Sequence, residues 1–156
     1  MPHPVTFPSA SARFSMPFLF AGQSQKEFFV NESVARIDAL LHPTIVEERG
    51  DPPASPSEGD AYLIATTATG NWEGKEDQIA VWQGSYWLLI EPRDGMMLRD
   101  ASSGAGAGQL LLFQGSWIRP SAIAAPTGGT SEDTEARAAI ESILSALQVY
   151  GILPSP

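Results

Sequence analysis

Apolar residues spaced three and four positions apart predict a helix near each end of the chain. The first helix is expected over residues 25–41. Its apolar stripe consists of Val30, Val34, Ile37 and Leu41. Ser24 and Glu27 have the spacing of a capping box, and Pro43 ends the segment because the residue before a proline leaves helical geometry.

The second helix is expected over residues 132–150, with Thr130 or Ser131 as its cap and Gly151 at its stop. Its apolar positions are Ala136, Ile140, Ile143, Leu147 and Tyr150. They repeat every 3.5 residues over about two heptads, as in a coiled coil. This seam either folds back on the chain's own sheet or meets other copies, and we favour the second.

Short apolar or alternating segments between the helices, bounded by glycine, proline, aspartate or serine, predict β-strands. They are residues 44–48, 61–66, 78–83, 86–91, 96–99, 109–113 and 117–118. The corner at 82–87 (WQGSYW) returns at 113–117 (FQGSW), and its glycine supplies the positive φ of a tight hairpin. We therefore predict an α+β fold, with the N-terminal helix packed on a small antiparallel β-meander and a tethered C-terminal helix.

Proline and glycine divide the chain into four parts. Residues 1–20 hold four prolines and four phenylalanines, which favours an extended N-terminal arm packed on its own domain or on a neighbouring subunit, with a disordered terminus as the alternative. Residues 21–120 form the helix and meander domain, and residues 101–108 form a flexible loop within it. Residues 121–130 are a linker, and residues 131–153 carry the C-terminal helix for oligomerisation or docking.

Charge and composition exclude several classes of partner. The chain has 156 residues, 43% of them hydrophobic, and a formal net charge of -9. This charge repels phosphate backbones and anionic membranes, so we expect no nucleic-acid binding. No stretch approaches the roughly 20 apolar residues of a membrane span. The first residues lack the basic and apolar regions of a signal peptide, so we expect synthesis in the cytoplasm and no membrane insertion.

Few residues suit catalysis or metal binding. There is no cysteine, and the two histidines, His3 and His42, lie far apart in sequence. The glycines of residues 104–108 are not followed by the Gly-Lys-Ser/Thr of a phosphate-binding loop. We therefore predict no metal, no cofactor and no catalytic residue. The least favoured of the functions that we consider is a small glycan-cleaving enzyme. Its candidate acids are Glu58, Asp60, Glu73, Glu91 and Asp94.

Aromatic residues on or between the strands are candidates for stacking on sugar rings. They are Trp72, Tyr86, Trp87 and Trp117. We expect Trp72, in the glycine-flanked turn 70–74, to be the most exposed. The alternative is that these rings form the core of the sheet, where large aromatic side chains dominate the buried area.

Several successive motifs together resemble a known family. They are GQSQKE (22–27) with Asn31-Glu32, GDAY (59–62), GNWEG (70–74), IAVW (79–82) through Trp87, and PRDG (92–95). Over residues 21–100 the chain resembles an uncharacterised domain family of alphaproteobacterial prophages and gene transfer agents. Its members are parts of tail-fibre, head-spike or other surface-appendage proteins, and it has no established catalytic residues.

The resemblance implies a non-enzymatic structural component of a phage or gene-transfer-agent particle that aids adhesion to the host surface. Homo-oligomers, with a trimer favoured, other particle proteins and host surface polysaccharide are the expected partners. The alternative, a function of a different class, is a carbohydrate-binding module for capsule or lipopolysaccharide sugars. The candidate subunit interface comprises Gln23, Gln25, Lys26, Asn31, Ile140, Ile143, Leu147 and Tyr150. A solvated helix surface is the alternative for its first four residues.

Overall fold

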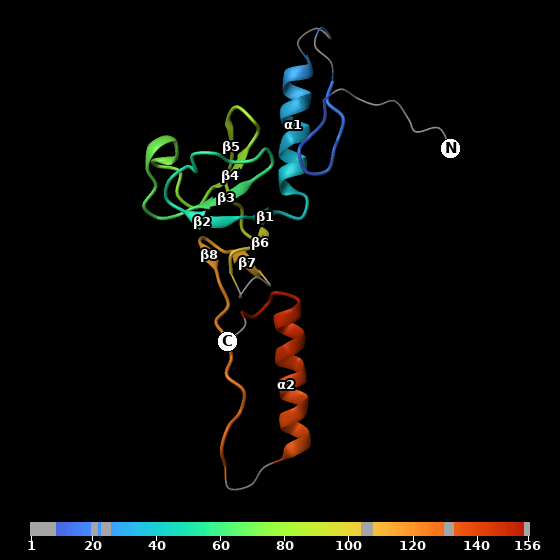
Figure 1. Ribbon diagram of the computed structural model, residues 1–156, viewed down its shortest axis with the longest axis vertical. Helices are drawn as coiled ribbons and strands as arrows, with labels where there is room; N and C mark the ends of the chain where they lie inside the picture. The colour runs from blue at the N-terminus through green and yellow to red at the C-terminus, as the bar shows by residue number, and fades with distance from the viewer. Residues whose placement is uncertain (1–8, 20–21, 23–25, 104–107, 130–132, 155–156) are drawn as a thin grey trace, which may run out of the picture.

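The computed structural model describes residues 9–19, 22, 26–103, 108–129 and 133–154. Within these residues, an N-terminal helix, α1 (Lys26–Leu40), packs beside eight short strands, and a C-terminal helix, α2 (Thr134–Val149), lies beyond them (Figure 1). The α+β fold class is thus confirmed. Neither helix is long and apolar enough to cross a membrane, within the residues described.

The strands form two four-stranded sheets. The first has the order β2 (Glu47–Arg49), β3 (Ala61–Ile64), β4 (Ile79–Trp82) and β5 (Trp87–Ile90). The second has the order β1 (Thr44–Ile45), β6 (Met97–Asp100), β7 (Gln109–Phe113) and β8 (Trp117–Ile118). Neighbouring strands are antiparallel, except that β2 pairs with β3 and β1 pairs with β6 in parallel.

This arrangement corrects the predicted single meander. The segment predicted as one strand, residues 44–48, is divided at Val46 into β1 and β2, which enter different sheets. Because β6 pairs with β1 and not with β5, the antiparallel succession stops after β5 and starts again at β6. Parallel pairing joins strands that are distant in sequence, so local patterns do not reveal it.

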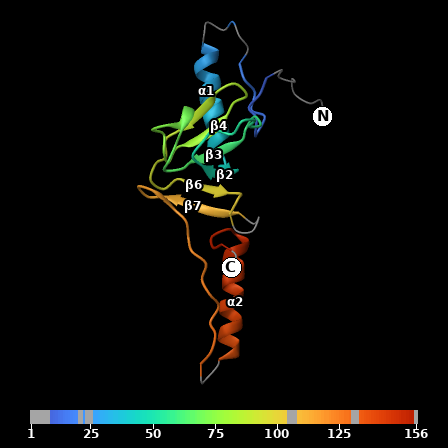
Figure 2. The same ribbon diagram turned by 60° about the vertical axis from the view of Figure 1, so that its left-hand side comes forward.

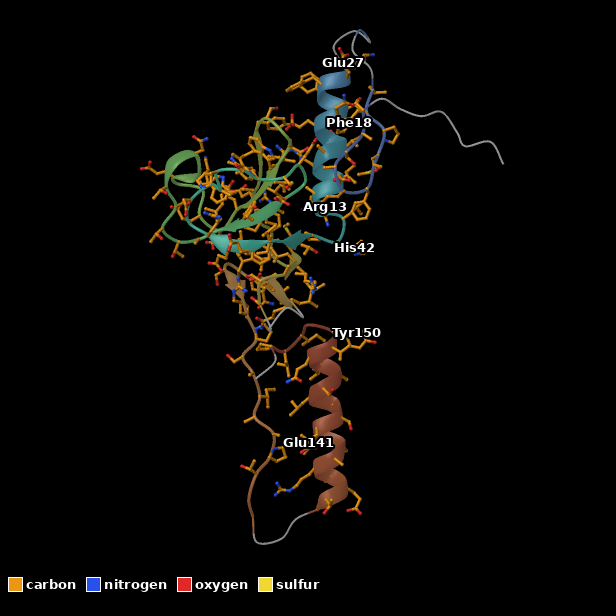
Figure 3. The ribbon with its side chains drawn as sticks, in the orientation of Figure 1. Arg13, Phe18, Glu27, His42, Glu141 and Tyr150 are labelled. Atoms are coloured by element: carbon orange, nitrogen blue, oxygen red, sulfur yellow. The ribbon has the colours of Figure 1, made fainter. Side chains whose placement is uncertain are left out.

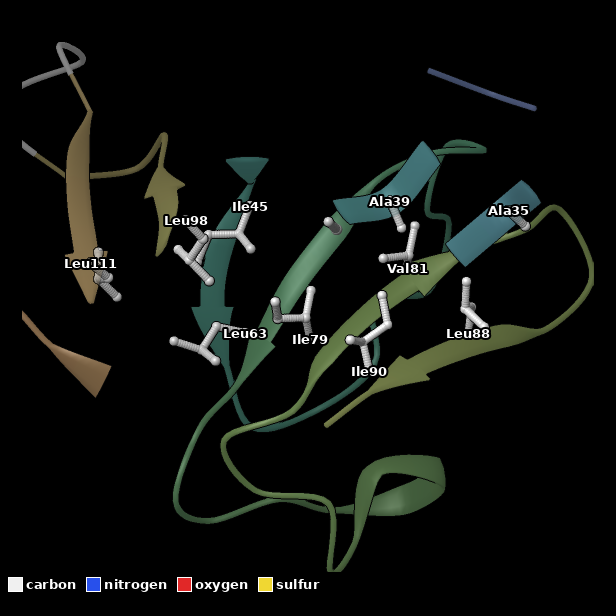
Figure 4. Packing of buried hydrophobic residues seen from close by; sticks show 11 residues of the cluster. Ala35, Ala39, Ile45, Leu63, Ile79, Val81, Leu88, Ile90, Leu98 and Leu111 are labelled. Atoms are coloured by element: carbon white, nitrogen blue, oxygen red, sulfur yellow. The ribbon is translucent and has the colours of Figure 1, made fainter. Parts of the chain in front are cut away.

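One hydrophobic core joins both sheets and α1 (Figure 4). The second sheet contributes Ile45, Leu98 and Leu111. The first sheet contributes Ala61, Leu63, Ile79, Val81, Leu88 and Ile90. A smaller cluster on the opposite face of the first sheet contains Tyr62, Ile64, Trp72 and Ala80. The first sheet is therefore apolar on both faces.

Helix α1 faces the sheet with small residues and not with the predicted apolar stripe. Ala35 and Ala39 are buried, whereas Ile37 is 51% exposed and Val30 is 41% exposed. The two alanines, one helical turn apart, let the helix backbone lie close to Val81 and Leu88 (Figure 4). Val30 and Ile37 of the predicted stripe are consequently left exposed, and Val34 is half-buried.

A buried carboxylate fastens the N-terminal arm to α1. Asp38 on α1 is 3% exposed and accepts a hydrogen bond of 2.6 Å from the Ser11 hydroxyl. It also accepts bonds from the backbone N–H groups of Arg13 (3.1 Å) and Phe14 (2.7 Å). The described part of the arm thus packs on its own domain, one of the two predicted alternatives, and it contains a turn at residues 12–14 where an extended segment was predicted.

The Arg13 guanidinium completes this attachment at the C-terminal end of α1 (Figure 3). It donates to the carbonyl oxygens of Asp38, Ala39 and His42. The last carbonyls of a helix lack intrahelical partners, and a cation beside them also interacts favourably with the helix dipole. One residue of the arm therefore caps the helix that the arm packs against.

Helix α2 is attached to the second sheet by its C-terminal end. The Gly151 carbonyl accepts a bond of 2.6 Å from the N–H of Leu110 in β7, and Leu153 is buried. The predicted stop is confirmed, because Ile152 N–H donates to the Leu147 carbonyl as in a Schellman motif. The N-cap is Asp133, which accepts from Ala136 N–H at 2.9 Å; the predicted caps Thr130 and Ser131 lie outside the described residues.

An ion-pair network joins the two sheets. Asp100 on β6 is 1% exposed and accepts bonds from the Ser102 and Ser103 hydroxyls and from Arg119 at 2.6 Å. Arg119 also pairs with Glu48 on β2 at 2.7 Å. Burial disfavours the charged carboxylate, but the hydrogen bonds from Ser102, Arg119 and Ser103 outweigh it and lower the pKa of Asp100 below its usual value.

Replacing Asp100 should make stability depend less on pH. A lowered folded-state pKa contributes stability above the unfolded pKa of about 3.9, and this contribution is lost as pH falls through the folded value. We expect Asp100→Asn to lower the free energy of unfolding by about 3 kcal/mol at pH 7, because it leaves Arg119 without its buried partner. Urea unfolding at pH 7, 4 and 3 should show this difference shrinking below pH 4. A difference that stays constant would contradict the pairing, and the exposed Glu73→Gln variant is the control.

Candidate functional site

The two glycine corners form the hairpins predicted from the repeat. In the first, Gln83 N–H donates to the Tyr86 carbonyl at 3.0 Å, and Gly84 has a φ of 78°. In the second, Gln114 N–H donates to the Ser116 carbonyl at 2.9 Å, and Gly115 has a φ of 70°. The first corner carries Tyr86 and Trp87 to the free edge of the first sheet.

Trp72 is buried, contrary to the predicted exposure. Its ring is 0% exposed and packs against Tyr62 and Trp87 at centroid distances of 5.9 and 5.0 Å. The short 3-10 helix η1 (Gly70–Trp72) folds it under the first sheet. The flanking glycines correctly indicated a turn, but the Trp72 side chain within that turn packs against the apolar face of the first sheet that carries Tyr62 and Ala80. Trp72 therefore has no face free to stack on a sugar.

The other three predicted stacking residues differ in exposure. Tyr86 is 51% exposed at the hairpin corner. Trp87 is half-buried, with its ring centroid 4.9 Å from that of Trp82. Trp117 is half-buried; its indole N–H donates to the Asp77 carbonyl at 2.9 Å and its ring packs against Phe113. The tertiary structure thus gathers Tyr86, Trp87 and the neighbouring Trp82, and places Trp117 elsewhere.

Two hollows flank the hairpin of β4 and β5. The first, of about 520 Å³, we call the proline hollow. Its defining residues are Pro52, Pro53, Pro56, Asn71, Trp82, Tyr86 and Trp87. The second, of about 890 Å³, lies between α1 and β5, and we call it the α1–β5 groove. Its defining residues are Glu27, Phe28, Glu32, Arg36, Glu58, Tyr86 and Leu89.

The chain pattern did not reveal the groove. Its helix residues 27–36 and its hairpin residues 83–89 are about fifty positions apart in sequence. Only the packing of α1 on the sheet brings them together. The available signal in the sequence was Phe28, a large apolar residue of the first helix that lies outside its predicted apolar stripe. The structure leaves it 68% exposed, and large apolar side chains in water often indicate a binding surface.

Several acids considered as catalytic candidates hold turns. Asp60 accepts from Ser57 N–H at 2.8 Å, and Asp94 accepts from Gly115 N–H at 2.8 Å. Burial, reinforced by the nearby Asp60 carboxylate, raises the pKa of the Tyr62 phenol, so this group stays a neutral donor. In the part of the chain that the structure describes, no three acidic or histidine side chains gather to hold a metal ion.

Two of the four predicted interface residues at the first helix, Lys26 and Asn31, lie within the described residues. Asn31 exchanges hydrogen bonds with the Leu19 backbone of its own arm, at 2.8 and 3.1 Å. Lys26 is exposed, while Gln23 and Gln25 lie outside the described residues. These bonds give the Asn31 amide a structural role within its own chain, and its part in a contact to another subunit stays a prediction.

The predicted seam of α2 is open to solvent over much of its length. Ile143 is 59% exposed, Tyr150 is 75% exposed and Ile140 is 43% exposed. Leu147 is half-buried near the attached end of the helix. No residue of α2 is fully buried, among those described. The seam therefore retains its apolar surface in the single chain.

A protein family of unknown function, DUF2793, matches residues 30–118, more than half of the chain. The chain belongs to this family. The DUF2793 region begins within α1 and ends with β8, so it contains both sheets but neither the arm nor α2. It extends past residue 100, where the sequence resemblance stopped, and includes β7 and β8. A comparison with curated proteins finds none that matches the chain.

Truncating Trp72 should destabilise the DUF2793 domain. We expect Trp72→Ala to lower the free energy of unfolding by about 3–5 kcal/mol, because it leaves a cavity beneath β3 and β4. Trp72→Phe should cost much less, because it keeps most of the ring and removes an indole N–H that has no partner among the described residues. Urea unfolding checks both values. Equal stability of the alanine variant and the wild type would contradict the burial.

Proposed function

We propose that the chain is a non-enzymatic structural component of a phage or gene-transfer-agent particle: a tail-fibre, spike or adaptor module that aids adhesion to the host surface. Two observations support this role. Residues 21–100 resemble the domains of such appendage proteins, and α2 presents an apolar seam away from the sheets. The exposed seam is the main support for the proposal, because an apolar helix face in water favours association with other copies.

The position of α2 supports self-association. The helix extends away from the second sheet and is accompanied by the linker (Figure 2). Arg137 donates to the linker carbonyls of Pro126 and Gly128, and it lies about 100° around the helix from Ala136 in the seam. The linker therefore covers a neighbouring side of α2 and leaves Ile140 and Ile143 accessible.

The residue types in the seam favour more than two copies, in keeping with the proposed trimer. A step of three residues separates Ile140 from Ile143, and a step of four separates Ile143 from Leu147. Ile140 thus takes a heptad position a and Ile143 a position d. Isoleucine at both positions shifts the preference from two strands to three or four. Two heptads bury little surface, so the trimer should dissociate on dilution.

A charge in the seam should abolish assembly. We expect the full chain to form trimers at high concentration and Ile143→Glu to be monomeric, because three carboxylates would meet at the helix interface. Light scattering after size-exclusion chromatography measures the mass of each. Ser145→Glu adds the same charge on the opposite, exposed side of α2 and should leave the trimer intact. A wild-type monomer at high concentration would remove the proposed assembly.

The second candidate is a carbohydrate-binding module for capsule or lipopolysaccharide sugars, with the proline hollow as its site. Among the described residues that line the hollow, none is charged. Aromatic rings line it at Trp82 and Tyr86, and the Asn71 amide and the Ser85 hydroxyl are polar groups at its surface. Flat apolar rings beside a few polar groups match the alternating apolar and hydroxyl faces of a sugar.

A glycan array tests this second candidate. We expect Tyr86→Ala and Asn71→Ala each to weaken binding of a neutral glycan about tenfold, a loss of about 1.4 kcal/mol. Phe29→Ala, which removes a ring exposed on α1 outside both hollows, should bind as the wild type does. Absence of binding to every glycan, or equal binding by all three variants, would leave assembly as the only proposed role.

A further inference from the structure

The edge strand β5 has an unpaired side. Within the described residues, β5 is the last strand of its sheet and pairs only with β4. Trp82 bonds toward β3, through Gly59 and Asp60, so Val81 and Gln83 bond toward β5. In the register of this pair, Leu88 lies opposite Val81, and alternation turns the backbone groups of Trp87 and Leu89 outward. Two residues thus offer N–H and C=O groups at the sheet edge.

The α1–β5 groove runs along this same edge. Its floor includes Leu88 and Leu89 of β5, and its opposite wall is the N-terminal half of α1. Figures 1 and 2 show the hairpin of β4 and β5 beside α1. The Leu89 carbonyl is held only loosely, by Arg36 of α1 at 3.5 Å. The backbone edge is therefore accessible from within the groove.

A strand edge beside a helix is the arrangement in which extended peptides bind by strand addition. The peptide backbone pairs with the edge strand, and alternate side chains enter the groove under the helix. The volume of about 890 Å³ is in the range of ligand sites. The exposed rings of Phe28 (68% exposed) and Tyr86 (51% exposed) are available to apolar side chains of such a peptide.

The charge of the groove specifies the kind of peptide. Three carboxylates, those of Glu27, Glu32 and Glu58, line it. Arg36 is the only basic residue among its described lining residues, and it already pairs with Glu32 at 2.9 Å. A ligand with lysine or arginine would complement this excess of negative charge.

We propose that the α1–β5 groove binds an extended segment of a partner protein in which apolar residues alternate with lysine or arginine, added as a strand to β5. This contact is independent of the seam of α2. It gives the domain a second attachment surface, with affinity from the backbone groups of Trp87 and Leu89 and specificity from the carboxylates of the groove.

Selection from a peptide library tests the proposal. A phage-displayed library of random eight-residue peptides is selected on the purified full chain, and the enriched peptides are synthesised as probes. We expect them to alternate apolar with basic residues. Isothermal titration should show weaker binding to the double variant Glu32→Gln, Glu58→Gln, and a smaller salt dependence than in the wild type. Asn71→Ala, in the proline hollow, should bind the probes normally.

Leu89→Pro tests the backbone contact directly. Proline removes the outward N–H of Leu89 and leaves the bonds between β4 and β5 in place, as edge strands tolerate. We expect Leu89→Pro to lower the affinity for the probe peptides at least tenfold. Leu89→Ala keeps the N–H, and its affinity for the probes should lie within about threefold of the wild-type value. Should the proline variant not fold, probe peptides N-methylated at alternate residues serve the same purpose on the wild type, with one of the two registers losing binding.

Three results would overturn the proposal. One is a selection that yields no peptides or peptides without basic residues. Another is equal binding of the probes to Leu89→Pro and Leu89→Ala, or of both N-methylated registers to the wild type. The third is loss of self-association in Leu89→Pro, which would identify a second copy as the occupant of the groove.

Discussion

The contact of Ala35 and Ala39 with the first sheet determines how the rest of the domain is arranged. Two small side chains one turn apart allow α1 to lie close to Val81 and Leu88. The helix rotation that buries the alanines also turns Asp38 toward the arm. There its carboxylate accepts hydrogen bonds from one hydroxyl and two backbone N–H groups. The same rotation leaves Ile37 and Phe29 in water.

The second constraint is that one short segment belongs to two sheets. Residues 44–49 supply β1 to one sheet and β2 to the other, so a single residue, Val46, connects the two sheets along the chain. Arg119 adds a charged connection by bonding to Asp100 of the second sheet and Glu48 of the first. The shared core with Leu98 and Leu63 fills the space between them.

As a result of these constraints, α2 and the two hollows lie at different ends of the molecule. Helix α2 is attached below the second sheet, while the proline hollow and the α1–β5 groove flank the first sheet (Figure 1). A particle subunit that assembles through α2 would therefore keep both hollows away from its assembly interface. The family match covers both sheets and does not extend to α2.

Features set by a few neighbouring residues followed from the sequence alone: both helices, the stop at Gly151, and the hairpins at Gly84 and Gly115. Their backbone geometry depends on local residue types. Which side of each element is buried was decided only in the tertiary structure. Most of the predicted stripe at the first helix is exposed and Trp72 is buried, because burial depends on the partner surface that each side chain meets. The groove beside β5 likewise exists only because α1, distant in sequence, packs close to that strand's free edge.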